Sequence, residues 1–191
     1  MPINELAPGI VVFENVFQNS MDYVQEIENN YESRWRPAEV LVNQDENKSG
    51  TNYNARNTDI NGLPHHSDKN DDLFSRLSKD FYNNINPHVK TYLQHYSAKI
   101  EKHEPPQLLR YGKDQRFHDH IDDHPFFTRR ISLTYYLNDD YEGGDVEFKR
   151  FGIRFKAKKN QLLVFPSNFI YNHEVYPVTD GLRYVIVQWM A

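Results

Sequence analysis

The second half of the chain is a series of short apolar segments separated by turn signals, and this pattern constrains the fold more than any other feature. After Pro105-Pro106, six runs rich in aromatic or β-branched residues have the length of β-strands. These runs are residues 107–111, 117–122, 130–137, 145–150, 161–165 and 184–189. Gly, Pro, Asn and Asp stand between them, as at Gly143-Gly144 and Asp180-Gly181. The pattern predicts antiparallel strands joined by turns.

The first half is predicted to contain the helices. A short buried strand is expected at Ile10–Phe13, followed by a helix that is capped by Asn19 or Ser20 and ends near Asn30. Apolar residues recur at helical spacing over residues 71–96, and Pro87 is expected to break this stretch into two helices.

Residues 43–70 are rich in Asn, Asp, Ser and Gly and are predicted to be loop, with one strand near residues 54–56. Helices followed by regularly spaced antiparallel strands favour an α+β protein, a β-sandwich or jelly roll supported by helices. The length of 191 residues fits one domain with a full core rather than two.

Composition excludes several function classes. The chain has no cysteine, which removes disulfides, thiolate catalysis and Cys-based zinc sites, and favours a reducing compartment. No signal-peptide pattern and no apolar run of about 20 residues is present, so a cytoplasmic protein without a membrane partner is expected. A net charge of -5 argues against nucleic acid as the main partner, because phosphate binding depends on Lys and Arg.

Two polar clusters in the second half predict a metal site. His120 and Asp122 are two positions apart, so on a strand both point to one face. His173 follows a later apolar run and a turn, and is expected to begin a neighbouring strand. Two His and one carboxylate hold non-haem Fe(II) on one face and leave its other positions open for substrate and oxygen. His120, Asp122 and His173 are therefore the candidate metal ligands and catalytic residues.

Other interpretations of these clusters exist. His118 falls on the same face as His120 if the strand continues, which gives a rival His-x-His pair of the cupin type. A cupin would carry a Glu four or five residues later, where this chain has His124 and Pro125. For His120-x-Asp122 alone, a solvated acidic hairpin end is the simpler interpretation.

Arg183 is the second informative residue. It follows the turn at Asp180-Gly181 and begins the last predicted strand, facing the same interior as His173. A buried guanidinium must be paired with an anion, and the far carboxylate of a 2-oxo acid would satisfy it in bidentate fashion. An ion pair with a nearby Asp or Glu is the alternative.

Residues from about 107 to 191 resemble the prolyl 4-hydroxylase-type branch of the 2-oxoglutarate/Fe(II) oxygenases. The matching features are Phe117, His120-x-Asp122, Arg130, Thr134-Tyr135-Tyr136-Leu137-Asn138, Gly143-Gly144-Asp145, Phe148, Leu163-Val164-Phe165-Pro166-Ser167, His173-Glu174-Val175, Pro177-Val178, Gly181 and Arg183-Tyr184. Upstream, Arg56-Asn57-Thr58 is similar to an Arg-Thr-Ser strand of the family. The resemblance implies one dioxygenase domain over residues 1–191 with a double-stranded β-helix (jelly-roll) core. Residues 1–105 would supply a strand and helical support, and residues 106–191 the β core with the metal site.

The resemblance also implies the roles of single residues. His120, Asp122 and His173 would bind Fe(II), and Arg183 would bind the far carboxylate of the co-substrate 2-oxoglutarate together with Tyr136. Tyr111 and Thr134 would line the co-substrate pocket, and ascorbate would support turnover.

The reaction implied is hydroxylation of a prolyl residue in a peptide or protein, with release of succinate and CO2. The same chemistry on a free amino acid, another small molecule or alkylated nucleic acid is the alternative. A non-catalytic binding domain on the same fold is a further one.

The chain departs from the family pattern in two places. Where the family carries Pro-x-x-Gly before the late apolar strand, this chain has residues 156–160, and Asn160 is expected to adopt the left-handed conformation in place of Gly. Residues 43–70 and 122–129 are expected to close over substrate but carry no recognisable pattern. The basic stretch from Lys149 to Lys159 is expected to be a solvated face rather than a nucleic-acid groove.

Overall fold

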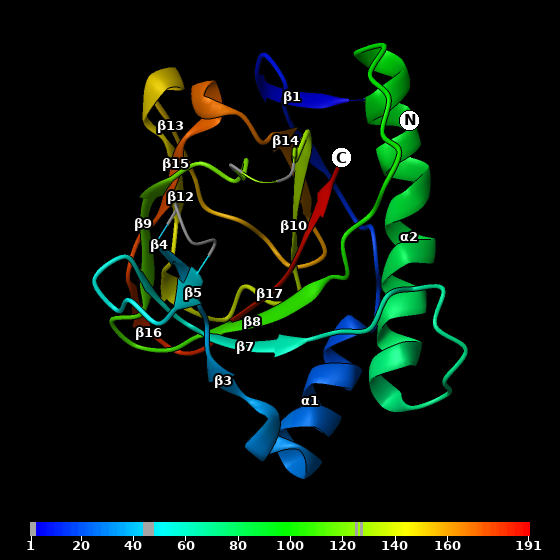
Figure 1. Ribbon diagram of the computed structural model, residues 1–191, viewed down its shortest axis with the longest axis vertical. Coiled ribbons are helices and arrows are strands. Elements are labelled where there is room, and N and C mark those ends of the chain that lie inside the picture. The colour runs from blue at the N-terminus through cyan, green and yellow to red at the C-terminus, as the bar shows by residue number, and fades with distance from the viewer. Residues whose placement is uncertain (1–2, 44–47, 125, 127) are drawn as a thin grey trace.

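The computed structural model describes residues 3–43, 48–124, 126 and 128–191, which form two antiparallel β-sheets with two helices on the outer side of the larger sheet (Figure 1). Within these residues the larger sheet has eight strands. Their spatial order is β1 (Asn4–Ala7), β2 (Ile10–Phe13), β14 (Leu162–Pro166), β10 (Ile131–Tyr136), β17 (Arg183–Met190), β8 (Gln107–Tyr111), β7 (Asp59–Gly62) and β3 (Arg36–Pro37).

The smaller sheet lies across the interior from the larger one and carries part of the candidate metal site. Among the described residues it has five strands, in the order β13 (Ile153–Phe155), β12 (Val146–Phe148), β15 (His173–Val175), β9 (Arg116–His120) and β6 (Arg56–Asn57). Two further pairs complete the strands: β11 (Glu142–Gly143) with β16 (Val178–Asp180), and β4 (Val40–Asn43) with β5 (Lys48–Gly50). Short 3-10 helices occur at η1 (Glu32–Arg34), η2 (Lys149–Phe151) and η3 (Phe169–Tyr171).

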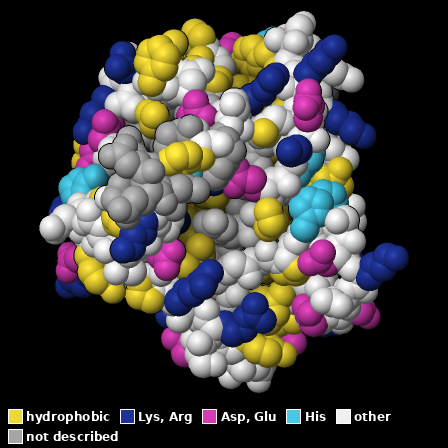
Figure 2. Space-filling model, in the orientation of Figure 1, with side chains coloured by type: hydrophobic (Ala, Val, Ile, Leu, Met, Phe, Trp, Pro, Cys, Tyr) yellow, Lys and Arg dark blue, Asp and Glu magenta, His cyan; other side chains and the backbone are white. Residues whose placement is uncertain are grey.

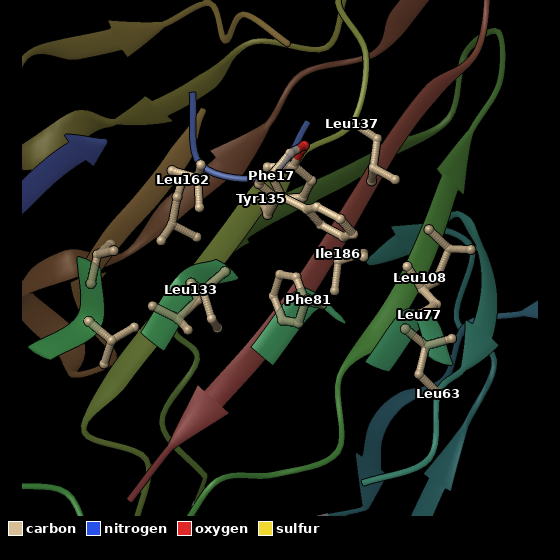
Figure 3. Packing of buried hydrophobic residues seen from close by; sticks show 14 of the residues in the cluster. Phe17, Leu63, Leu77, Phe81, Leu108, Leu133, Tyr135, Leu137, Leu162 and Ile186 are labelled. Atoms are coloured by element: carbon tan, nitrogen blue, oxygen red, sulfur yellow. The ribbon is translucent and has the colours of Figure 1, made fainter. Parts of the chain in front are cut away.

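Strand alternation separates two apolar clusters. On β10, Tyr135 faces the helices and Tyr136 faces the smaller sheet; on β17, Ile186 and Val185 divide in the same way. The cluster under the helices includes Phe17, Leu77, Phe81, Leu133, Tyr135 and Ile186 (Figure 3). The larger sheet is therefore apolar on both faces, and its inner face is available to form a site.

Helix α1 (Ser20–Asn30) begins where the sequence predicts, with Asn19 at its N-terminal boundary. The prediction that Pro87 divides residues 71–96 into two helices is wrong, because α2 (Leu73–His95) is continuous through it. Pro87 lies on the exposed side of α2, whereas Phe81, Ile85 and Val89 are buried. Burial of this apolar stripe outweighs the lost backbone hydrogen bond of one proline.

The predicted strands of the second half are present as β8, β9, β10, β12, β14 and β17. Residues 43–70 differ from expectation, because their described part contains the end of β4 and strands β5, β6 and β7 rather than loop with one strand. Asn160 has φ of 65°, so the left-handed turn expected there is confirmed. No helix in the described part of the chain is long and apolar enough to cross a membrane.

Candidate metal and co-substrate site

The three candidate metal ligands meet between two neighbouring strands. His120 is the last residue of β9 and His173 the first residue of β15, and the two stand opposite each other in the antiparallel register. Asp122 lies two residues past the end of β9, so the expectation that it shares a strand with His120 is wrong. Its carboxylate nevertheless returns to the same point. One ligand atom from each residue lies within 4.8 Å of the others, and this is the only such group within the described residues.

Hydrogen bonds orient both imidazoles toward the carboxylate. Nδ1 of His120 lies 2.7 Å from the main-chain oxygen of His118, and Nδ1 of His173 lies 3.2 Å from that of Tyr171. Since a carbonyl only accepts, each Nδ1 carries the proton and each Nε2 keeps its lone pair. The Nε2 atoms lie 3.5 Å (His120) and 3.9 Å (His173) from the Asp122 carboxylate oxygens.

The protonation states suit metal binding. Burial lowers the pKa of His173 to about 4, and the neighbouring His120 acts in the same direction. Burial alone would raise the pKa of Asp122, but His173, His120 and a hydrogen bond from Ser132 hold it well below its usual range. At neutral pH the site therefore offers a neutral imidazole and an ionised carboxylate, as a divalent metal ion requires.

Aromatic rings wall the site. The ring of His120 stacks on Phe117, with centroids 3.4 Å apart and planes at 12°. The ring of His173 packs against Phe165 and Phe148, at centroid distances of 4.8 Å and 5.4 Å. These contacts fix the ring planes and keep the space behind the ligands apolar.

The interior cavity beside the triad is lined by three of the four predicted co-substrate residues, and Tyr136 is not among its lining residues. Arg183, Tyr111, Thr134, His120, Asp122 and His173 all line it. Arg183 and Tyr111 are opposite each other on β17 and β8, and Tyr136 comes from β10 on the other side of β17. The guanidinium carbon of Arg183 lies 4.8 Å from the ring centroid of Tyr111 and 5.2 Å from that of Tyr136.

Arg183 is 1% exposed and lacks a full set of partners. Its Nε and Nη1 atoms, and the hydroxyl of Tyr136, have no hydrogen-bond partner within the part of the chain that the structure describes. Burial raises the pKa of Tyr136, so its hydroxyl remains a proton donor. Buried donors of this kind call for an acceptor, and a carboxylate would satisfy all three. The alternative of a local ion pair is not seen among the described Asp and Glu side chains.

Gly144 makes room for Arg183. Its φ is +66°, and a Cβ atom built there would lie 2.9 Å from Cδ of Arg183. The Gly143-Gly144 turn predicted from sequence thus has a second role, because any side chain at residue 144 would displace the guanidinium.

An open cleft of about 950 Å³ leads from the surface to the triad. One wall comes from the β4–β5 hairpin and its neighbours, and the other from residues 121–124, Arg129 and Trp189. Both segments expected to close over substrate therefore border the cleft in their described parts. Residues 44–47, 125 and 127 lie outside the described residues.

Arg56 and Trp189 line both the cleft and the interior cavity, and neither was among the predicted site residues. Arg56 is 7% exposed, and its Nε has no partner within the described segments. Its signal in the sequence was the Arg56-Asn57-Thr58 similarity. Trp189 could have been found because it is an even number of positions from Arg183 on one strand, so both side chains point to the same face.

The rival interpretations receive no support from the geometry. His118 is outside the metal-ligand group; its Nδ1 lies 3.7 Å from Glu174 and its main-chain oxygen binds His120. In the basic stretch, Lys149, Arg154 and Lys156 each pair with a carboxylate. Charges of both signs are also intermixed on the face shown in Figure 2.

Comparison with known proteins agrees with this geometry. Residues 106–191 match the family model of the 2OG-Fe(II) oxygenase superfamily. The resemblance to prolyl 4-hydroxylase-like oxygenases is confirmed. This family implies Fe(II) and 2-oxoglutarate, and His120, Asp122 and His173 form a possible iron-binding triad.

Sequence relatives match less than half of the chain. A PKHD-type hydroxylase of Rippkaea orientalis is 31% identical over 90 residues, which are 42% of this chain and 40% of that protein. Another, from Synechococcus sp. (strain CC9311), is 34% identical over 84 residues, or 41% of this chain and 37% of that protein. The chain thus matches less than half the length of these relatives.

Solved structures show the same fold over nearly the whole chain. A Trichoplax adhaerens prolyl hydroxylase, solved with a peptide fragment of the hypoxia inducible factor oxygen degradation domain, has a TM-score of 0.74 at 17% identity and covers 95% of this chain and 83% of its own. A Pseudomonas putida prolyl-4-hydroxylase has a TM-score of 0.71 at 17% identity, covering 95% and 92%. The fold shared with these structures therefore includes the first half, beyond the residues that the family model matches.

Proposed function

We propose that this protein is an Fe(II)- and 2-oxoglutarate-dependent dioxygenase that hydroxylates a prolyl residue in a peptide or protein. One observation carries the proposal: a His-Asp-His triad and a buried Arg with unpaired donors line the same interior cavity. We further propose that the two facing sheets form a double-stranded β-helix within a single domain over residues 1–191.

The residues divide into two groups by chemistry. His120, Asp122 and His173 would hold the iron through two imidazoles and one carboxylate. Bound Fe(II) and 2-oxoglutarate would supply oxygen activation coupled to decarboxylation, with release of succinate and CO2. The protein itself would bind and orient the metal ion and the co-substrate, and would exclude water from the cavity.

The far end of 2-oxoglutarate would be held by Arg183 and Tyr136. Their unpaired N–H and O–H groups would donate hydrogen bonds to the far carboxylate of 2-oxoglutarate. Arg183 lies in β17, where pairing with β8 fixes its position. Tyr111 and Thr134 would form the sides of this pocket from β8 and β10. The apolar remainder, which includes Leu109 and Val185, would exclude water from the co-substrate.

The peptide substrate is supported by the relatives and by the open cleft. The sequence relatives are PKHD-type hydroxylases, and one neighbour by fold is a prolyl hydroxylase with a bound peptide. A cleft of about 950 Å³ that opens to the surface has room for an extended chain. A free amino acid or another small molecule remains the second candidate, because the same cleft has room for either one.

Anaerobic titration with Fe(II) and then 2-oxoglutarate tests the cofactor assignment. A visible charge-transfer band should appear only when both are present, and Asp122→Ala should abolish the band and turnover while leaving the fold intact. Succinate production by Asp122→Ala at the wild-type rate would overturn the proposal.

The substrate assignment needs a separate measurement. Proline-containing peptides and free amino acids would be incubated with the loaded enzyme, and gain of one oxygen atom would be followed by mass spectrometry. Hydroxylation of prolyl peptides, but not of free proline, supports the proposal; the reverse result selects the small-molecule alternative.

A further inference from the structure

The side chain of Arg129 links the loop behind Asp122 to the last strand. Its Nε and Nη2 atoms each donate to one carboxylate oxygen of Glu104 at 2.6 Å. Its Nη1 atom donates to the main-chain oxygen of Asp122 at 3.2 Å. The guanidinium lies over the ring of Trp189, 3.9 Å from the centroid. One side chain thus contacts an acid, a metal-ligand residue and a wall of the cleft.

Glu104 is itself held rigidly. Its main-chain N–H donates to the oxygen of Trp189 at 2.9 Å, and its main-chain oxygen accepts from Nε2 of Gln188 at 2.7 Å. Pro105 follows directly and restricts the backbone further. The main chain of Glu104 is therefore fixed to β17, independently of the loop that contains Asp122.

Asp122 needs such support because it lies beyond the end of β9. Its neighbour Asp123 is fixed on both sides: the main-chain N–H donates to Ser167, and the carboxylate accepts from the main-chain N–H groups of His124 and Arg129. Nη1 of Arg129 adds a bond to the carbonyl of Asp122 itself. These bonds replace the ladder that would hold a residue inside a strand.

We propose that Glu104 is a positioning residue of the metal site, acting through Arg129 to fix the main chain of Asp122. This inference rests on the proposed function, since it assumes that Asp122 binds the metal ion. Glu104 occupies the bidentate edge of the Arg129 guanidinium. Arg129 therefore forms a charge-compensated wall beside Trp189.

Metal affinity measures this role without requiring turnover. The full chain would be titrated anaerobically with Mn(II), followed by electron paramagnetic resonance, and with Co(II), followed by its visible absorption. Loss of a group that orients a metal ligand typically weakens metal binding by roughly 10- to 100-fold. We expect Glu104→Gln, which lacks the charge and keeps only one acceptor oxygen for Arg129, to weaken Mn(II) binding by at least tenfold and to alter the Co(II) spectrum.

Three further variants sharpen the test. Glu101→Gln removes an exposed carboxylate from the same segment and should leave both metal titrations unchanged. Glu104→Asp retains the charge, so its Mn(II) affinity should lie between those of Glu104→Gln and wild type. If Glu104 only supported the local fold, the retained charge would not restore affinity. Arg129→Gln should weaken binding as Glu104→Gln does, and the double variant should be no weaker than either one, because both act through one contact.

The outcomes are distinguishable. Wild-type Mn(II) affinity in a folded Glu104→Gln protein, or additive effects in the double variant, would overturn the role of Glu104 and leave the proposed function standing. If wild-type protein binds neither Mn(II) nor Fe(II), the metal site and this inference fail together. If Glu104→Gln does not fold, Glu104→Asp decides, because wild-type affinity and spectrum with a displaced carboxylate would contradict the positioning role.

Discussion

At the scale of single residues, the polar atoms that lack partners are the most informative. Arg183 and Tyr136 are almost completely buried, yet three of their donor atoms bond to nothing within the described residues. Burial of such groups costs free energy in the ligand-free protein, so the arrangement is favourable only when an acceptor enters. Substitution of Arg183 or Tyr136 by an apolar residue should therefore weaken 2-oxoglutarate binding without lowering the stability of the ligand-free protein.

Arg183→Met is expected to weaken 2-oxoglutarate binding by on the order of a thousandfold, since a charge-assisted buried pair contributes about 3–5 kcal/mol. Tyr136→Phe removes one hydroxyl and should weaken binding about tenfold. Titration of the Mn(II)-loaded protein with 2-oxoglutarate measures both effects. Without 2-oxoglutarate, urea unfolding of Arg183→Met should show equal or greater stability than wild type. A large loss of stability there would mean that Arg183 already has a partner.

The candidate site was largely predictable at this scale because its residues are chemically distinctive. His120, Asp122, His173 and Arg183 are residue types with specific metal- or anion-binding chemistry, and all four line one interior cavity, although Asp122 reaches it from beyond the end of β9. Glu104 could not be found in the same way. A single Glu before two prolines carries no pattern, and its role depends on a contact with a residue far along the chain.

At the scale of elements, α2 shows how packing overrides a local signal. Pro87 removes one backbone hydrogen bond, but the buried stripe continues through Phe81, Ile85 and Val89. In the short strands β3 and β6, tertiary pairing creates an element that the local sequence does not indicate. Their two-residue sequences have no strand periodicity of their own, and they are strands only because β7 and β9 are available to pair. Sequence reasoning that is local cannot detect either effect.

Replacement of Pro87 by Ala should restore the missing hydrogen bond and stabilise the protein by about 1–3 kcal/mol, because the site is exposed and already helical. The free energy of unfolding in urea measures this change. Lys90 is also exposed on α2, so Lys90→Ala is a control that should change the free energy of unfolding little. Destabilisation by Pro87→Ala would mean that the proline stabilises the fold through the unfolded state.

Contacts between elements also predict a pH dependence. His66 stacks on Tyr82 of α2, with centroids 3.7 Å apart, and lies beside His65 and His103. Burial, followed by the charge of His65, lowers the pKa of both His66 and His103 from 6.5. The unfolded chain then binds protons more readily than the folded one as the pH falls. Stability is therefore complete above about pH 6.5 and is lost below it.

The free energy of unfolding, measured in urea at several pH values between neutral and mildly acidic, should fall as the pH falls. His173, whose pKa is lowered to about 4, contributes in the same direction over this range, so a variant is needed to isolate the cluster. His66→Phe keeps a ring against Tyr82 and should flatten the pH dependence. An equal slope in wild type and His66→Phe would exclude the cluster as its source.

At the scale of the whole molecule, the two halves of the chain form one structure. β2 pairs with β14, and β7 pairs with β8, so the first half extends the larger sheet at both ends. Leu77 and Phe81 of α2 also cover the outer face of β10 and β17 (Figure 3). Val24 and Ile27 of α1 belong to the same apolar cluster. We therefore propose that the residues matched by the family model, 106–191, are part of one unit with the first half.

We expect residues 106–191 alone to lack cooperative unfolding, because the outer face of their sheet would be exposed to water. The full chain should unfold in one transition. Trp35→Phe leaves Trp189 as the only tryptophan, so its fluorescence reports the second half while far-ultraviolet circular dichroism is dominated by the helices of the first. Coincident transitions support one domain, and separated transitions would contradict it.

Strand β17 has a consequence for how this site can vary. It carries Arg183 at the closed end of the cavity and Trp189 at the mouth, about 20 Å apart at the usual rise of a strand. A single extended backbone thus sets the distance between the far end of the co-substrate and the entry of the substrate. Insertion of one residue would turn every following side chain to the opposite face. An insertion or deletion within β17 would therefore disrupt the cavity lining, so we expect substrate preference to vary through the loops around the mouth instead.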